Sequence, residues 1–257
     1  MPHAYPTPQH AEAAEAVVAF FALRPEVDAV LLTCSCARGK ATPDSCLDIA
    51  VLTAAEADPA PLWHAWDAHY RDAPVFHALR QVGAFSNVDL DLVDGVFEPD
   101  PDAHGWTTGP DAFELEIGNL LAYSVPLWTR NARFAEMRDV WLPYYGEGLR
   151  AERLAMVRRY CLNNLDHIPL YAPRGLPFQC LARLQMAYGE FLQALFIAQR
   201  TYPIAYDKWI RDLFFDVTAT TEIYTQSLAL FQIEDLESDE IVEKAASLKS
   251  MLARCTM

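Results

Sequence analysis

The sequence predicts an α+β protein, with a small mixed sheet and its helices first and an α-helical bundle after them. Before residue 110, short apolar runs alternate with turn residues, and from Phe113 onward apolar residues recur at helical spacing. Residues 99–112 form a stretch rich in Pro, Gly and Asp that is typical of a linker. We therefore expect an α/β domain over residues 1–110 and a helical bundle domain over residues 111–257.

The first elements follow from the apolar pattern. Residues 11–23 read as an amphipathic helix, and residues 27–34 as a buried strand rich in Val and Leu. Residues 46–53 form a second such run, so a second strand is expected there. Residues 60–83 have a helical pattern, with a break expected at Pro74.

A third strand is expected within residues 85–99, where apolar and acidic residues alternate. Val88, Leu90 and Leu92 fall on one face, and Asp89 and Asp91 on the other. The later chain has four stretches of helical pattern, over residues 147–165, 181–200, 206–217 and 239–254.

Composition and charge limit the function. No apolar stretch reaches the roughly 18 residues that a membrane span needs. No basic segment followed by an apolar run is visible at the start, so we expect a cytoplasmic protein whose six cysteines are reduced. The formal net charge of -15 repels nucleic acids. It favours a small-molecule partner, either cationic or, given the many tyrosines and tryptophans, aromatic.

The segment "TCSCARGKATPDSCLDIAVL", residues 33–52, carries the chemistry of an anion site. A turn directly after a strand exposes backbone N–H groups, and Ser35 adds a hydroxyl. Arg38 and Lys40 place positive charge there, and Gly39 permits a tight turn. We expect this turn to bind phosphate.

Acidic residues follow the turn. Cys46 and Asp48 are two apart on the second strand and should share a face, and Asp89 and Asp91 are the acids of the third strand. If these strands are neighbours, the carboxylates converge on one point. Oxygen ligands beside a phosphate site are typical of Mg²⁺, with Asp48 and Asp89 as the expected ligands.

Residues 33–52 resemble the signature of the nucleotidyltransferase superfamily. Ser35, the "ARG" of residues 37–39, the "PDS" of residues 43–45 and Asp48 stand in the family's order and spacing, and Asp89 is the best match for its third acid. A helical bundle after such a domain resembles the aminoglycoside adenylyltransferases. The resemblance implies transfer of a nucleoside monophosphate, with ATP as the donor, Mg²⁺ as the cofactor and a small molecule as the acceptor.

Two positions depart from this pattern. The motif glycine is Cys34, and the first strand acid is Cys46. Since Mg²⁺ prefers oxygen over sulfur, the second change weakens a two-metal site. The alternatives are an enzyme that reuses the fold for another reaction, with Cys46 or the remaining acids in acid–base or nucleophilic roles, or a catalytically inactive nucleotide or metabolite sensor or antitoxin-like partner protein.

Further candidates surround this motif. Cys34, Cys36 and Cys46 could be structural thiols or, with His64 or His77, ligands of a soft metal. Glu114 and Glu116 fit either a general base or the acidic first turn of a helix.

In the bundle, Arg183 and Glu190 lie off the apolar stripe of their helix, and Lys208 stands among tyrosines and a tryptophan. A cleft-facing set would place Arg183 and Lys208 on phosphate and Glu190 as a general base. Ordinary packing explains the same pattern.

Overall fold

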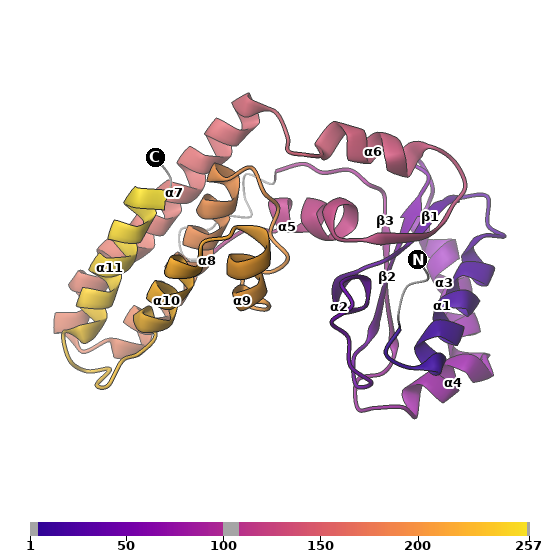
Figure 1. Cartoon of the computed structure of the whole chain (residues 1–257), viewed down its shortest axis with the longest axis horizontal. Helices are drawn as coiled ribbons and strands as arrows, with labels where there is room; N and C mark the ends of the chain where they lie inside the picture. The colour runs from indigo at the N-terminus through magenta and orange to yellow at the C-terminus, as the bar shows by residue number, and fades with distance from the viewer. Residues whose placement is uncertain (1–4, 100–107, 256–257) are drawn as a thin grey trace. The chain divides into compact units, whose positions relative to one another are not determined.

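The computed structural model describes residues 5–99 and 108–255, which form two compact units (Figure 1). The first unit comprises Met1–Phe97 and Asn119–Leu142, and the second comprises Glu98–Gly118 and Pro143–Met257. This division differs from the single boundary expected at residue 110, because residues 119–142 return to the first unit. Most of the expected linker, residues 100–107, lies outside the described residues.

The first unit is built on a four-stranded mixed sheet with the strand order β3-β2-β1-β4. Its strands are β1 (Val27–Leu32), β2 (Leu47–Thr53), β3 (Val88–Val93) and β4 (Val125–Thr129). β1 pairs antiparallel with β2 and β4, whereas β2 and β3 are parallel. The predicted α+β class and the three predicted strands are confirmed.

Three helices cover one face of this sheet: α1 (Pro8–Phe21), α3 (Pro59–Asp72) and α4 (Pro74–Arg80) (Figure 1). Leu47, Ile49 and Val51 of β2 point into this core, as alternate residues of a strand must. Trp66 of α3 packs there against the rings of Phe21 and Phe76. The opposite face of β2 carries Asp48 at its start, followed by the buried Ala50 and Leu52.

The strand β4 was not predicted, since the sequence after Phe113 has a mostly helical pattern. Pro126 lacks an N–H donor, and β4 accordingly lies at the edge of the sheet, where a missing donor is tolerated. Two arginines fasten the segment that follows. Arg130 donates to the carbonyls of Ala22, Arg24 and Val27, and Arg133 forms a salt bridge with buried Asp28 at 2.8 Å.

The second unit is helical, as expected for a bundle. Its elements are α5 (Phe113–Ile117), α7 (Glu147–Tyr171), the 3-10 turn η2 (Ala172–Arg174), α8 (Pro177–Ala198), α9 (Ile210–Asp212), the π-helical η3 (Leu213–Val217), α10 (Thr221–Leu230) and α11 (Glu240–Cys255). The first unit further contains α2 (Cys34–Ala37), most of the π-helical η1 (Gly118–Ala122) and α6 (Arg133–Trp141). The helix predicted from residue 206 begins only at Ile210, after Trp209 with a left-handed φ of 60°. Within the described ranges, each helix is too short or too polar to cross a lipid bilayer.

A buried polar cluster, formed by Asp111, Glu114, Arg153 and Gln193, links α7 and α8 to the segment around α5 in the second unit. Arg153 of α7 binds Asp111 through two hydrogen bonds of 2.6 and 2.7 Å and Glu114 through two of 2.7 and 3.0 Å. Gln193 of α8 donates to both carboxylates at 2.8 Å. Because Arg153 is 2% exposed and Glu114 0%, these charges depend on one another for their solvation.

Replacing Arg153 with Met should therefore destabilise the chain strongly. The change leaves Asp111 and Glu114 as two buried negative charges without a cation, at a cost of about 3–5 kcal/mol in the free energy of unfolding. Urea unfolding followed by circular dichroism measures this loss. The control is Lys249→Met, which removes an exposed pair with Asp166 and should cost less than about 1 kcal/mol. Equal effects of the two substitutions would contradict a structural role for the cluster.

Candidate functional site

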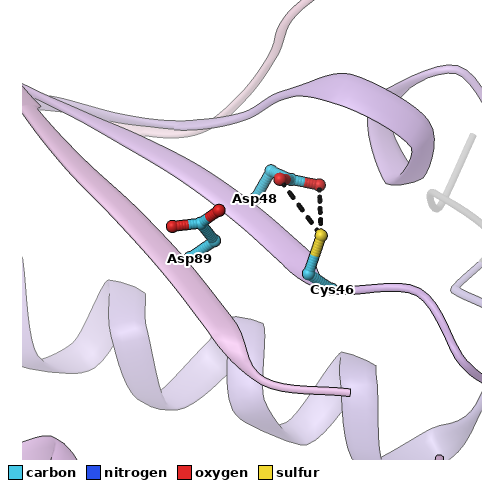
Figure 2. A group of neighbouring side chains, drawn as sticks. All are labelled: Cys46, Asp48 and Asp89. Carbon is cyan, nitrogen blue, oxygen red and sulfur yellow. Dashed lines mark hydrogen bonds between the residues drawn. The ribbon is translucent and has the colours of Figure 1, made fainter. Parts of the chain in front are cut away.

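A thiol and two carboxylates converge where β2 and β3 begin (Figure 2). Cys46 directly precedes β2 and Asp48 is its second residue, so the two side chains share a face. β3 runs parallel to β2 with Asp89 opposite Asp48. The potential ligand atoms of Cys46, Asp48 and Asp89 consequently lie within 4.8 Å of one another. We call these three residues the thiol–carboxylate cluster.

Within the cluster, the Cys46 thiol is directed at the carboxylate of Asp48. Its sulfur lies 3.3 Å from Oδ1 and 3.3 Å from Oδ2, and it acts as the donor (Figure 2). Cys46 and Asp48 are half-buried, whereas Asp89 is exposed. The cluster is thus anchored in the sheet on one side and open to solvent on the other.

The surroundings of Cys46 favour its neutral form. Burial raises the pKa of the Cys46 thiol to about 12, together with the negative charge of Asp48, the hydrogen bond to Asp48 and the charge of Asp89. At neutral pH the residue is therefore a neutral thiol that donates a hydrogen bond to Asp48. It is not the negatively charged ligand that an aspartate would supply at this position.

The turn after β1 lies beside the cluster. The N–H of Thr33 donates to the carbonyl of Asp48 at 3.0 Å, and the Cys36 thiol contacts the carbonyl of Cys46 at 3.6 Å. Cys34 begins α2 with a left-handed φ of 51°, a conformation that glycine adopts most easily. The position that departs from the motif glycine thus keeps the backbone conformation for which glycine is suited.

The predicted anion-binding residues belong to this turn. Ser35 and Arg38 are half-buried, and Lys40 is exposed. Burial raises the pKa of the nearby Tyr123 hydroxyl to about 12, and the positive charge of Arg38 opposes that rise. Arg38 therefore lies close enough to Tyr123 for its positive charge to act on that hydroxyl.

A second loop sets the position of Cys46. The Nε2 atom of His10 in α1 bonds the carbonyl of Ser45 at 2.9 Å, and its Nδ1 atom bonds the hydroxyl of Thr7 at 2.8 Å. His10 is 0% exposed, so this is a buried tether between the first helix and the residue before Cys46. Sequence reasoning missed it, because a single histidine in an amphipathic helix carries no sign of its partner.

The same loop also holds the start of β3. Ser86 donates to the carbonyl of Pro43 at 2.6 Å, and Asp44 accepts from the N–H of Ala84 at 3.2 Å. Gly83 passes so close that a Cβ on it would lie 2.4 Å from the Asp44 carboxylate. Only glycine fits there without displacement, so the chain that leads into β3 can pack closely on the loop before β2.

Asp91, the other acid expected on β3, does not belong to the thiol–carboxylate cluster. Asp91 is exposed and stands opposite Ala50, two residues further along the strands than Asp89. In the part of the chain that the structure describes, the group of potential metal ligands includes Asp89 and leaves out Asp91.

The candidates of the second unit differ in exposure. The Glu116 side chain is exposed at the surface. Neighbouring protein atoms still remove part of the water around its carboxyl, and this desolvation, together with the negative charge of Asp111, raises its pKa. Glu114 is the buried partner of Arg153. Arg183 and Glu190 are 5% and 0% exposed, which is at odds with the expected cleft-facing pair, because both bind the side chain of Asn164 on α7.

Residues 200–209, the aromatic stretch that follows α8, include both buried rings and an exposed lysine. Tyr202 is 2% exposed and its ring lies 4.8 Å from that of Tyr144, whereas Lys208 is exposed. Of the cationic and acidic candidates in this unit, Lys208 and Glu116 are therefore the ones that solvent reaches.

The alternative soft-metal site with a histidine is not found among the described residues. His64 bonds the carbonyl of Ala60 in its own helix, and His77 bonds Arg80. Cys34 and Cys36 likewise stand outside the group that contains Cys46.

The thiol–carboxylate cluster does not fit the pair of magnesium ions that the resemblance implies. Two carboxylates and a thiol converge, and sulfur is a poor ligand for Mg²⁺. Three donors within 4.8 Å of one another fit a single divalent cation, with Asp48 and Asp89 as its oxygen ligands.

Comparisons with known proteins add little to this geometry. The chain matches no protein-family model, and no curated protein is similar to it in sequence. Among solved structures, it is similar to a nucleotidyltransferase-like protein from Exiguobacterium sibiricum 255-15, with 12% identity and a TM-score of 0.48. The match covers 95% of this chain and 74% of that chain. At this level of similarity the function has to be derived from the site itself.

The protonation of Cys46 gives a direct test of the cluster. Asp48→Asn removes a negative charge and a proton acceptor that together raise the pKa of the Cys46 thiol, so the thiolate fraction at mildly alkaline pH should increase. We expect alkylation of Cys46 by iodoacetamide to become several-fold faster, as measured by mass spectrometry of the Cys46 peptide. Asp91→Asn, on the neighbouring strand β3 and outside the cluster, should leave the rate unchanged. An unchanged rate in Asp48→Asn would show that the two side chains are not in contact in solution.

Proposed function

We propose that the first unit binds a nucleoside triphosphate, with ATP as the donor, together with one divalent cation, and that the protein transfers the nucleoside monophosphate to a small molecule. The observation that carries this proposal is the convergence of Asp48 and Asp89 beside the Thr33–Lys40 turn. Carboxylates next to a turn with basic residues are the arrangement that a metal-bound triphosphate needs.

Each part of the site has a role in the proposal. Ser35, Arg38 and Lys40 bind the triphosphate, and Asp48 and Asp89 hold the cation. A cation bound there neutralises phosphate charge and favours attack on phosphorus. Thr33 couples the two parts, because its N–H bonds the carbonyl of Asp48 and so fixes the turn relative to the carboxylates.

Exposure decides between the candidates of the second unit. Glu116 and Lys208 are exposed, and the raised pKa of the Glu116 carboxyl would strengthen it as a base toward a ligand of the second unit. Glu190 and Arg183 are assigned to the packing of α7 on α8, since both are buried around Asn164.

The acceptor we propose is a small cationic molecule in the cytoplasm. The formal net charge of -15 attracts cations and disfavours nucleic acids as substrates. This charge is a property of the whole chain, so it supports the class of acceptor and no particular compound.

A second function is favoured by one observation, the neutral thiol at the position of the first acid. The Cys46 thiol is hydrogen-bonded to Asp48, and the site has two carboxylates where the superfamily pattern has three. Such a site would bind a nucleotide without transferring it, which is the property of a sensor.

Titration calorimetry with ATP and Mg²⁺ tests the proposal. The wild-type chain should bind, and Asp48→Asn should weaken binding by at least tenfold, about 1.4 kcal/mol, because it removes a cation ligand. Asp91→Asn serves as the control and should bind like wild type. Absence of ATP binding by the folded wild-type chain, with Mg²⁺ and with Zn²⁺ alike, would refute both functions.

Pyrophosphate release then separates transfer from sensing. The measurement uses ATP with a panel of polyhydroxylated amines as acceptors, for wild type and for Cys46→Asp. Release by wild type supports transfer. Release by Cys46→Asp alone marks the natural protein as a nucleotide-binding relative of transferases.

A further inference from the structure

We propose that the thiol–carboxylate cluster is a site for a single thiophilic divalent cation, of which Zn²⁺ is the type, with Cys46 as a direct ligand that releases its proton to solvent when the ion binds. This inference rests on the proposed function only in placing a cation between β2 and β3. It names the class of that cation and gives Cys46 a role that the superfamily pattern does not contain.

The chemistry of the three donors is the first support. One sulfur and two carboxylate groups form a mixed set that Zn²⁺ accepts, whereas Mg²⁺ demands six oxygen ligands in octahedral geometry. A thiol in place of the first acid reduces the affinity for Mg²⁺ and raises the affinity for a softer ion. The same substitution thus has opposite effects on the two metals.

The distances support the same ion. With metal–sulfur and metal–oxygen bonds of about 2.3 and 2.1 Å, the edges of a tetrahedron are roughly 3.4–3.6 Å long. The Cys46 sulfur lies 3.3 Å from each oxygen of Asp48, and all three donors lie within 4.8 Å of one another. Small side-chain movements therefore suffice to bring sulfur and oxygens to zinc-binding distances.

The local structure leaves a ligand position open. Cys46 and Asp48 are half-buried at the start of β2, and the loop before them is held by contacts with His10 and Ser86, whereas Asp89 is exposed. Zinc sites that act on substrates have three protein ligands and an open fourth position. The cluster supplies three ligands, and solvent or a phosphate oxygen can reach the fourth position past Asp89.

Metal binding without nucleotide tests this inference. The probes are Cd²⁺ and Co²⁺, whose bonds to thiolate give sulfur-to-metal charge-transfer absorption, and calorimetry with Zn²⁺ and Mg²⁺. We expect one ion per chain with a charge-transfer band. Cys46→Ser should lose the band, and Cys34→Ser, which removes an exposed thiol of the neighbouring turn, should keep it.

The ratio of affinities is the decisive quantity, because Zn²⁺ binds most sites more tightly than Mg²⁺ does. We expect the ratio of Zn²⁺ to Mg²⁺ affinity to fall at least tenfold from wild type to Cys46→Asp. An unchanged ratio, or a band that survives in Cys46→Ser, would overturn the inference.

Protection from alkylation gives a readout that needs no variant. If Cys46 is a ligand, Zn²⁺ should block its alkylation in the wild-type chain and leave Cys34 reactive. Alkylation of Cys46 at the same rate with and without Zn²⁺ would exclude it as a ligand. Because none of these measurements contains nucleotide, a failure of the proposed transferase function would leave their outcome unaffected, and the reverse also holds.

Discussion

The parallel pairing of β2 and β3 is the constraint on which the candidate site depends. Its register places Asp89 opposite Asp48, and the alternation of a strand places Cys46 on the same face as Asp48. A shift of one residue in either strand would turn its acid into the core and bring Leu47 or Leu90 to the surface. The packing of the apolar face on the helices therefore also fixes the position of Asp48 and Asp89 on the opposite face of the sheet.

The loops before the two strands protect this register. Buried His10 holds Ser45, Ser86 holds Pro43, and Gly83 lies against Asp44 without room for a side chain. Each contact joins a segment that leads into β2 to another part of the first unit. These contacts fix the loops at the start of the two strands, where the cluster lies, and none of them involves the side chains of Cys46, Asp48 or Asp89.

Local patterns in the sequence predicted the parts of the structure that depend on near neighbours. The alternation from Val88 to Asp91 predicted β3 and the solvent face of its acids, and the turn after β1 was predicted from Ser35 to Lys40. The pairing of Arg153 with Asp111 was not predictable, because the two residues are far apart and Asp111 belongs to a stretch typical of a linker. The short strand β4 was missed because it lies in a part of the sequence whose pattern is mostly helical.

The thiol at residue 46 also changes the cluster when no cation is bound. An aspartate there would place a third negative charge beside Asp48 and Asp89, and like charges at such distances destabilise one another. A neutral thiol instead donates to Asp48 and relieves that repulsion. Without a cation the cluster therefore has less charge repulsion than a set of three carboxylates would have. Cys46 thus lowers the demand for magnesium while it supplies the sulfur that a softer ion prefers, and both effects follow from one atom at the start of β2.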